Sequence, residues 1–345
     1  MVNPRAAVTG LRIGEHGGER VTTAAKQLID FSVCLNPYGP PSFVFTAIDE
    51  AGGEINRYPD TECTALRENI AEKYGRTPNE VLAGAGVSEL IQLVALAFAR
   101  RRVLIPVHTY GEYETAARIM GAQITPLAMP ERQIRPEVLI DALHAADLLF
   151  LCNPNNPTGQ YLPRNALEGI LERAERVDAL VVLDEAYVDF VQTAFPAHTL
   201  ALANLIILRS LTKSFAMPGI RIGYAISAAS TIAAMRAVQV PWSVSAVAQR
   251  VGAAVIGPEG DAFLAGTRRR IEQSKKQIER VLDVQSDANY YLLPVGDARR
   301  MKAMLVQHGM LVRDCTSFGL PAHIRFSVKK DEENERLLTV LKGEG

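Results

Sequence analysis

The segment with the clearest chemical potential is Arg209–Tyr224, RSLTKSFAMPGIRIGY, in which Lys213 follows two hydroxyl side chains and precedes Arg221. A lysine amine can form a Schiff base with an aldehyde cofactor, while hydroxyls and an arginine can hold a phosphate on that cofactor. Taken alone, Lys213 is more simply explained as a solvated loop lysine, because most lysines lie on protein surfaces. The rest of the chain decides between these interpretations.

Two further segments carry polar groups that suit the same chemistry. Asn153–Gly159, NPNNPTG, follows an apolar run, and Asn156 can donate a hydrogen bond to a phenolic oxygen. Asp184–Tyr187, DEAY, follows the next apolar run. A carboxylate there can keep a pyridine nitrogen protonated, and Tyr187 can bind the same phenolic oxygen. Each residue alone has a plainer explanation, Asp184 as a helix cap and Tyr187 as core packing, but their joint spacing makes coincidence a poor explanation.

A glycine turn adds a candidate anion site. Val81–Gly86, VLAGAG, is predicted to be a short strand running into glycines, with Ser88 as the N-cap of a helix over Glu89–Arg100. Free amides and the helix dipole at such an N-terminus favour phosphate. The signal is weak by itself, because many strand–helix turns bind nothing.

The elements that position these residues alternate between helix and strand. Strands that are apolar along their whole length, such as Asp147–Cys152 and Leu180–Leu183, indicate a mostly parallel sheet covered on both faces. Ligands of such sheets bind beyond the carboxyl ends of the strands, where the polar segments lie. The chain therefore predicts an α/β fold with a three-layer large domain.

The pattern changes after Trp242, where two helices, at Ala246–Val255 and Ala262–Leu282, precede a mixture of short strands and helices. This predicts a smaller α+β domain. We expect an N-terminal arm over 1–45 that joins the small domain and the active site, a large domain over 46–240 and a small domain over 241–345.

Composition restricts the kinds of partner. With 345 residues and 48% hydrophobic content the chain can build a sizeable core, and its net charge of -1 gives no bias toward nucleic acid. No apolar run is long enough to span a bilayer, and the N-terminus lacks the apolar core of a signal peptide. The four cysteines lie far apart, and the histidines have no metal-ligand spacing. We expect a cytoplasmic protein with no metal, nucleic-acid or membrane partner.

The assembled segments resemble the fold-type I pyridoxal 5'-phosphate enzymes of the aminotransferase class I/II superfamily. The matching segments occur in the family's order: NRYPD, GAGVSEL, HTYGEY, CNPNNPTG, DEAYVDF, SLTKSFAMPGIRIGY and IRFSV. Within the superfamily the chain is similar to histidinol-phosphate aminotransferases and threonine-phosphate decarboxylases. Its segments EHGGE, DFSVCLNPYGPP, VPWSVSAVAQ and ANYYLL are closer to the decarboxylases. The resemblance implies an aspartate-aminotransferase-like fold, pyridoxal 5'-phosphate as cofactor and a homodimer with shared active sites.

The resemblance also implies a role for each matched residue. Lys213 would carry the cofactor and move the proton, Asp184 would pair with the ring nitrogen, and Tyr187 and Asn156 would bind the ring oxygen. The cofactor phosphate would be held by Gly86, Val87, Ser88, Ser210, Thr212 and Arg221. Tyr110 would stack on the ring, and Tyr58 would reach the cofactor phosphate of the partner subunit. Arg325 would grip the substrate carboxylate, and the other substrate contacts would come from His16, Asn36, Asn156 and Arg313. For His16, Asn36 and Arg313, a solvated loop or strand-end position is an equally good explanation.

Three positions depart from the pattern or have no place in it. Ala85 stands where relatives often have asparagine in the phosphate turn, so one polar contact is missing while the amides remain. Cys34 stands where the decarboxylases can carry asparagine, which bears on substrate contacts from the arm. His108 lies near a strand end, but the resemblance assigns it no role.

Three functions are compatible with these residues. The first is decarboxylation of O-phospho-L-threonine, or of O-phospho-L-serine, to the amino-alcohol phosphate in cobalamin biosynthesis. The second is a histidinol-phosphate-type aminotransferase that uses 2-oxoglutarate and glutamate. The third, a cofactor-binding protein without catalysis, conflicts with the presence of the lysine, aspartate, tyrosine and arginine. On this cofactor the bond perpendicular to the ring breaks, so substrate pose decides between the first two, and the sequence does not show that pose.

Overall fold

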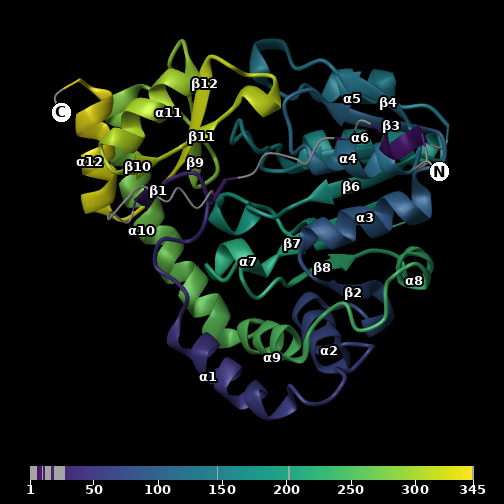
Figure 1. The fold of residues 1–345 in the computed structure, drawn as a ribbon. Coiled ribbons are helices and arrows are strands. Elements are labelled where there is room, and N and C mark those ends of the chain that lie inside the picture. The colour runs from purple at the N-terminus through teal and green to yellow at the C-terminus, as the bar shows by residue number, and fades with distance from the viewer. Residues whose placement is uncertain are drawn as a thin grey trace, which may run out of the picture.

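The structure, a computed structural model, describes residues 6–9, 11, 17–18, 28–145, 147–200 and 203–343. Its centre is a seven-stranded sheet in the order β2-β8-β7-β6-β5-β3-β4 (Figure 1). Neighbouring strands are parallel except β8, which is antiparallel to both β2 and β7. The strands are β2 (Val81–Gly84), β3 (Arg102–Pro106), β4 (Gln123–Leu127), β5 (Leu148–Cys152), β6 (Leu180–Asp184), β7 (Leu205–Ser210) and β8 (Gly223–Ile226).

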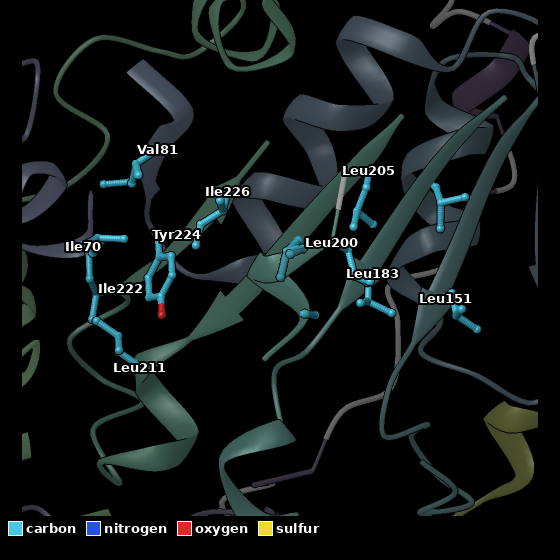
Figure 2. Packing of buried hydrophobic residues seen from close by; sticks show 14 of the residues in the cluster. Ile70, Val81, Leu151, Leu183, Leu200, Leu205, Leu211, Ile222, Tyr224 and Ile226 are labelled. Atoms are coloured by element: carbon cyan, nitrogen blue, oxygen red, sulfur yellow. The ribbon is translucent and has the colours of Figure 1, made fainter. Parts of the chain in front are cut away.

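Alternating side chains of the central strands enter two separate hydrophobic cores, one on each face of the sheet. Leu149 and Leu151 of β5 pack into one core, whereas Leu148 and Phe150 pack into the other. Figure 2 shows the first core, where side chains of several strands line up along one face. Because both faces are buried, the strands are apolar throughout, which is the pattern that predicted a three-layer fold.

Helices cover both faces of this sheet. They are α1 (Ser42–Ala51), α2 (Thr64–Tyr74), α3 (Val87–Phe98), α4 (Glu112–Ile119), α5 (Pro136–Ala142), α6 (Arg164–Arg176), α7 (Leu211–Ser214), α8 (Ala229–Ala237) and α9 (Ala246–Val255). Helix α2 ends where Gly75 adopts φ +62°, a conformation in which glycine has no Cβ to clash. Helices α3 and α4 pack together, as do α5 and α6.

A second, smaller core holds the rest of the chain. The antiparallel sheet β11-β12-β9 is built from β9 (Tyr290–Pro294), β11 (Arg313–Asp314) and β12 (His323–Ser327). It packs with α10 (Pro258–Leu282), α11 (Ala298–Gln307) and α12 (Asp331–Leu341). In the arm, β1 (Ile29–Asp30) pairs in parallel with β10 (Met310–Leu311), so the arm joins this part of the molecule. Strands β10 and β11 are separated by one residue but belong to two different sheets.

The packing of α9 bears on the domain boundary. Helix α9 contacts α1 and α2, and Val251 and Val255 belong to the core of the large sheet. Helix α10 then runs from α9 to the small sheet (Figure 1), and its residues Ile271 and Ile278 lie in the smaller core. Helix α9, which lies within the predicted small domain, therefore packs with the core of the large sheet. The division into domains otherwise remains a prediction.

The described residues were searched for membrane-spanning helices and for metal-binding clusters. No helix among them is long and apolar enough to cross a membrane. Within the same ranges, no three histidine, cysteine, aspartate or glutamate side chains are grouped so as to hold a metal ion.

Candidate active site

A cavity of about 370 Å³ lies where β5, β6 and β7 end. Cys152 at the end of β5 is in register with Asp184 at the end of β6, and β7 ends at Ser210, so the loops that follow meet at one edge of the sheet. Twelve of the residues predicted from the sequence line this cavity: Val87, Ser88, Tyr110, Asn156, Asp184, Tyr187, Ser210, Thr212, Lys213, Arg221, Arg313 and Arg325.

Lys213 lies on α7, a single helical turn that directly follows β7. Burial lowers the pKa of Lys213, and the positive charges of Arg325 and Arg221 lower it further, whereas Asp184 acts in the opposite direction. A lowered pKa enlarges the fraction of neutral amine, the form that can attack a carbonyl carbon or accept a proton.

Asp184 ends β6 with its carboxylate buried at the cavity. The Tyr113 hydroxyl donates to Oδ2 at 2.7 Å, and the Ala186 amide donates to Oδ1 at 3.0 Å. Burial raises the pKa of Asp184 to about 6, while these hydrogen bonds and nearby Lys213 oppose that rise. A cationic partner inside the cavity would stabilise the buried charge.

Arg325 reaches the cavity from the small sheet and is 5% exposed. Its Nη1 donates to Asn156 Oδ1, and its Nη2 donates to the Ser32 carbonyl oxygen at 2.7 Å. The buried Nε has no hydrogen-bond partner, and no ion pair to Arg325 is found within the described ranges. A buried cation with an unused donor at a cavity suits an anionic ligand.

The turn between β2 and α3 forms a backbone cradle. Gly86 has φ +83°, and a Cβ at this position would lie 2.6 Å from Nη2 of Arg221. Gly86 is the N-cap of α3, so the prediction that Ser88 caps this helix is wrong; Ser88 is the second residue of the helix and lies 3.4 Å from the Tyr110 hydroxyl. The side chains of Ser210 and Thr212 are hydrogen-bonded to each other at 2.8 Å.

Two tyrosine rings, those of Tyr110 and Tyr187, line the cavity. Tyr110 packs edge-on against Tyr113 with ring centroids 5.6 Å apart, and Tyr113 stacks on Phe150. Tyr187, 7% exposed, packs edge-on against Tyr290 at 5.0 Å. These contacts fix the orientation of both cavity-lining rings.

Some predicted residues do not lie at the cavity. Asn36 was expected to bind substrate, but its Nδ2 donates to the Ser214 carbonyl and to Thr267 Oγ1, both at 2.9 Å. Asn36 therefore holds the arm against α7 and α10, and Cys34 lines the cavity instead. Tyr58 is 79% exposed and stacks on Trp242 with ring centroids 4.4 Å apart. His16 lies outside the described residues.

Several contacts at the cavity were not predicted from the sequence. Ser32 acts through its backbone carbonyl, for which the sequence gives no signal. Ser317, also at the cavity, accepts a hydrogen bond from Nη2 of Arg313 at 2.6 Å. Tyr113 lies in the segment HTYGEY, and its spacing of three residues from Tyr110 is the sequence signal that the two rings are neighbours at the start of a helix.

The sheet is covered by helices on both faces, and a lysine, a buried carboxylate and a phosphate cradle lie at the carboxyl ends of its strands. This combination is typical of pyridoxal-phosphate enzymes. A family model described as "Aminotransferase class I and II" matches residues 26–341, and the chain belongs to this family. The cofactor of this family is pyridoxal 5'-phosphate, so the predicted cofactor and enzyme class are confirmed.

Individual relatives cover most of the chain. Threonine-phosphate decarboxylase of Salmonella typhimurium is 32% identical over 333 residues, which cover 92% of this chain and 91% of the relative. Histidinol-phosphate aminotransferase of Symbiobacterium thermophilum is 32% identical over 332 residues, covering 90% and 89%. The solved structure of histidinol-phosphate aminotransferase from Clostridium acetobutylicum superimposes with a TM-score of 0.84 at 26% identity, covering 92% of this chain and 98% of that one. The predicted fold is confirmed.

The residues at the cavity fit the cofactor. The Gly86 cradle, the N-terminal amides of α3 and the Arg221 guanidinium would hold its phosphate, and Asp184 would pair with its protonated ring nitrogen. Lys213 would bind its aldehyde carbon. When bound, the cofactor supplies an electron sink for cleavage of a bond at the amino-bearing carbon of the substrate.

Proposed function

We propose that the protein is a lyase that decarboxylates O-phospho-L-threonine or O-phospho-L-serine to the amino-alcohol phosphate. We further propose cobalamin biosynthesis as its pathway and the cytoplasm as its location. The similarity to the Salmonella threonine-phosphate decarboxylase supports the reaction, although an aminotransferase is similar to the same degree.

The observation that carries this proposal is a pair of buried arginines on one face of the small sheet. Arg313 on β11 is directly opposite Arg325 on β12, and the two residues are 4% and 5% exposed. Directly opposite residues have Cβ atoms about 5 Å apart, and like charges in such positions destabilise a sheet. Both side chains line the cavity, so a ligand with two anionic groups could be bound by both arginines at once. O-phospho-L-threonine carries a carboxylate and a phosphate in one molecule.

The fixed position of Arg325 gives it control over the carboxylate. Asn156 and Ser32 hold its guanidinium from two sides, which leaves Nε as an unused donor. The orientation in which Arg325 holds the carboxylate would decide whether the carboxylate or the Cα hydrogen is lost, with the cofactor supplying the electron sink. Lys213 lies at the same cavity and would return a proton to Cα after carbon dioxide leaves.

The alternative is a histidinol-phosphate-type aminotransferase that uses glutamate and 2-oxoglutarate. The same arginine pair would then bind the two carboxylates of glutamate in one half-reaction, and the phosphate of histidinol phosphate in the other. The identity of 32% to the Symbiobacterium aminotransferase supports this alternative.

One assay separates the two reactions. The cofactor-loaded protein receives O-phospho-L-threonine without a keto acid, and carbon dioxide and the amine product are followed over many turnovers. Sustained release is the expected result, because an aminotransferase without an acceptor stops after one half-reaction. A single conversion of the cofactor, or none, contradicts the proposal. Activity with histidinol phosphate and 2-oxoglutarate would then establish the alternative.

We also propose that the enzyme is a homodimer in which each subunit completes the site of the other. Tyr58 lies away from the cavity of its own chain and presents its ring and hydroxyl at the surface beside Trp242. Large apolar side chains exposed together are typical of interaction surfaces. In the dimer, Tyr58 would reach the cofactor phosphate of the partner subunit.

A further inference from the structure

A tight turn beside Arg313 presents side chains to the cavity. The chain leaves β11, passes through the 3-10 helix Thr316–Phe318 and turns at Gly319 before it enters β12. Ser317 and Phe318 both line the cavity. The turn is closed by hydrogen bonds from the amides of Phe318 and Gly319, each at 2.9 Å, to carbonyl groups within the turn.

Arg313 and Ser317 act as one polar unit. The Arg313 guanidinium donates to Ser317 Oγ at 2.6 Å and lies 5.6 Å from the centre of the Phe318 ring. Because the Ser317 oxygen accepts from Arg313, the serine hydroxyl hydrogen points elsewhere and is available to a ligand oxygen. A guanidinium and a hydroxyl that donate side by side suit a phosphate group.

His108 fixes this turn from the other domain. Its Nδ1 lies 2.8 Å from the Phe318 carbonyl oxygen. A carbonyl oxygen only accepts hydrogen bonds, so Nδ1 carries the hydrogen and donates. The carbonyl of His108 itself accepts from Asn155 Nδ2 at 2.9 Å, and Thr109 donates to Asn155 Oδ1 at 2.8 Å. His108 is thereby anchored to the NPNNPTG loop of the large domain.

We propose that His108 is a positioning residue that clamps the 315–319 turn, so that Arg313 and Ser317 together bind the distal anionic group of the substrate. Ser317 is a direct contact to that group, and His108 acts only through the turn. This inference rests on the proposed function, because it assumes a substrate with a phosphate at the far end. It assigns a role to a histidine for which the sequence showed none.

The test compares a phosphorylated with an unphosphorylated ligand on the cofactor-loaded enzyme. Apparent dissociation constants for O-phospho-L-threonine and L-threonine come from the initial absorbance change of the bound cofactor, recorded by rapid mixing before the substrate is consumed. The ratio of the two constants measures the contribution of the phosphate alone. His108→Ala should reduce the preference for the phosphorylated ligand about tenfold, as expected when charge-assisted contacts lose their alignment.

Two further variants exclude a general structural effect. His108→Asn keeps an N–H donor near the position of Nδ1 and should restore most of the preference. His308→Ala, at the exposed end of α11, should leave the preference unchanged. The role of His108 is overturned if His108→Ala keeps the preference for O-phospho-L-threonine over L-threonine. It is also overturned if His108→Asn loses as much of this preference as His108→Ala does.

Ser317→Ala tests the direct contact separately. It should lower the preference for O-phospho-L-threonine several-fold while the dissociation constant for L-threonine stays unchanged. An unchanged preference in this variant rejects Ser317 as a ligand contact. If the unaltered enzyme itself shows no preference for the phosphorylated ligand, the proposed function fails, which is distinct from failure of the clamp.

Discussion

The carboxylate of Asp184 links protein stability to cofactor binding. Burial raises its pKa in the folded protein to about 6, from the ordinary value of 3.8. Between these values the folded protein holds a proton that the unfolded chain has lost, so stability falls as pH rises through this range. Above pH 6 the penalty is constant at about 3 kcal/mol.

Asp184→Asn should therefore stabilise the protein without cofactor. We expect a higher unfolding temperature than that of the unaltered protein at about pH 7.5, with a difference that disappears below about pH 3, where the carboxyl is protonated in both folded and unfolded chains. Thermal unfolding across this pH range checks the prediction. Asp141→Asn, at an exposed position, is the matched control.

The same pair of proteins should respond differently to the cofactor. In the unaltered protein the cationic ring nitrogen would compensate the buried carboxylate, so added pyridoxal 5'-phosphate should raise its unfolding temperature more than that of Asp184→Asn. The prediction is contradicted if the unaltered protein and Asp184→Asn have equal unfolding temperatures at every pH. It is also contradicted if the cofactor raises both unfolding temperatures equally, because Asp184 would then not link stability to cofactor binding.

At the scale of elements, the turn from β2 to α3 has no room for a larger residue. At φ +83° and ψ 168° the Gly86 backbone has a conformation essentially restricted to glycine, so an alanine there would cost about 1–3 kcal/mol, and its Cβ would displace the Arg221 guanidinium. Gly86→Ala should weaken cofactor binding at least tenfold, as measured by titration of cofactor absorbance. Gly53→Ala, where an added Cβ meets no atom within 4 Å, should bind cofactor normally. Normal binding by Gly86→Ala would remove the turn from the phosphate site.

Elements with a strong period were predictable from the sequence, and elements set by tertiary context were not. Helix α9 has the predicted bounds because its apolar spacing and end residues agree. Helix α7 is only four residues long and its residues are mostly polar, so its segment was predicted as a loop. Helices α1 and α8 were not predicted; α8 has small residues that give little contrast between its faces.

Site residues that come directly after a strand in the sequence were predictable, whereas residues placed by contacts with distant parts of the chain were not. Lys213, Asp184 and Asn156 come directly after strand ends, and the parallel sheet brings those ends together. The position of Asn36 depends on contacts with Ser214 and Thr267, which are distant in the sequence, so its type and motif were misleading. Backbone contacts, such as the Ser32 carbonyl with Arg325, carry no side-chain signal.

At the scale of the whole molecule, shared active sites predict that two inactive variants complement each other. Lys213→Ala lacks the reactive amine, and Tyr58→Ala lacks the contact to the partner's cofactor. In a hybrid dimer one site has both intact residues, so an equimolar mixture that exchanges subunits should recover about a quarter of the full activity. Activity of the mixture is measured after the subunits have exchanged.

The controls are the activity of each variant assayed alone and the sum of those two activities. Each homodimer alone should stay strongly impaired, and the activities should simply add if subunits do not exchange. No recovery despite demonstrated exchange would contradict the placement of Tyr58 in the partner's site.

The stack between Tyr58 and Trp242 also has an optical consequence. Trp242 is the only tryptophan of the chain and is 48% exposed. Indole emission shifts to shorter wavelength when water is removed from the ring, and one indole gives one unmixed signal. The protein thus contains a native fluorophore at the surface that we propose for dimerisation. Its emission maximum during dilution would report subunit dissociation without any attached dye.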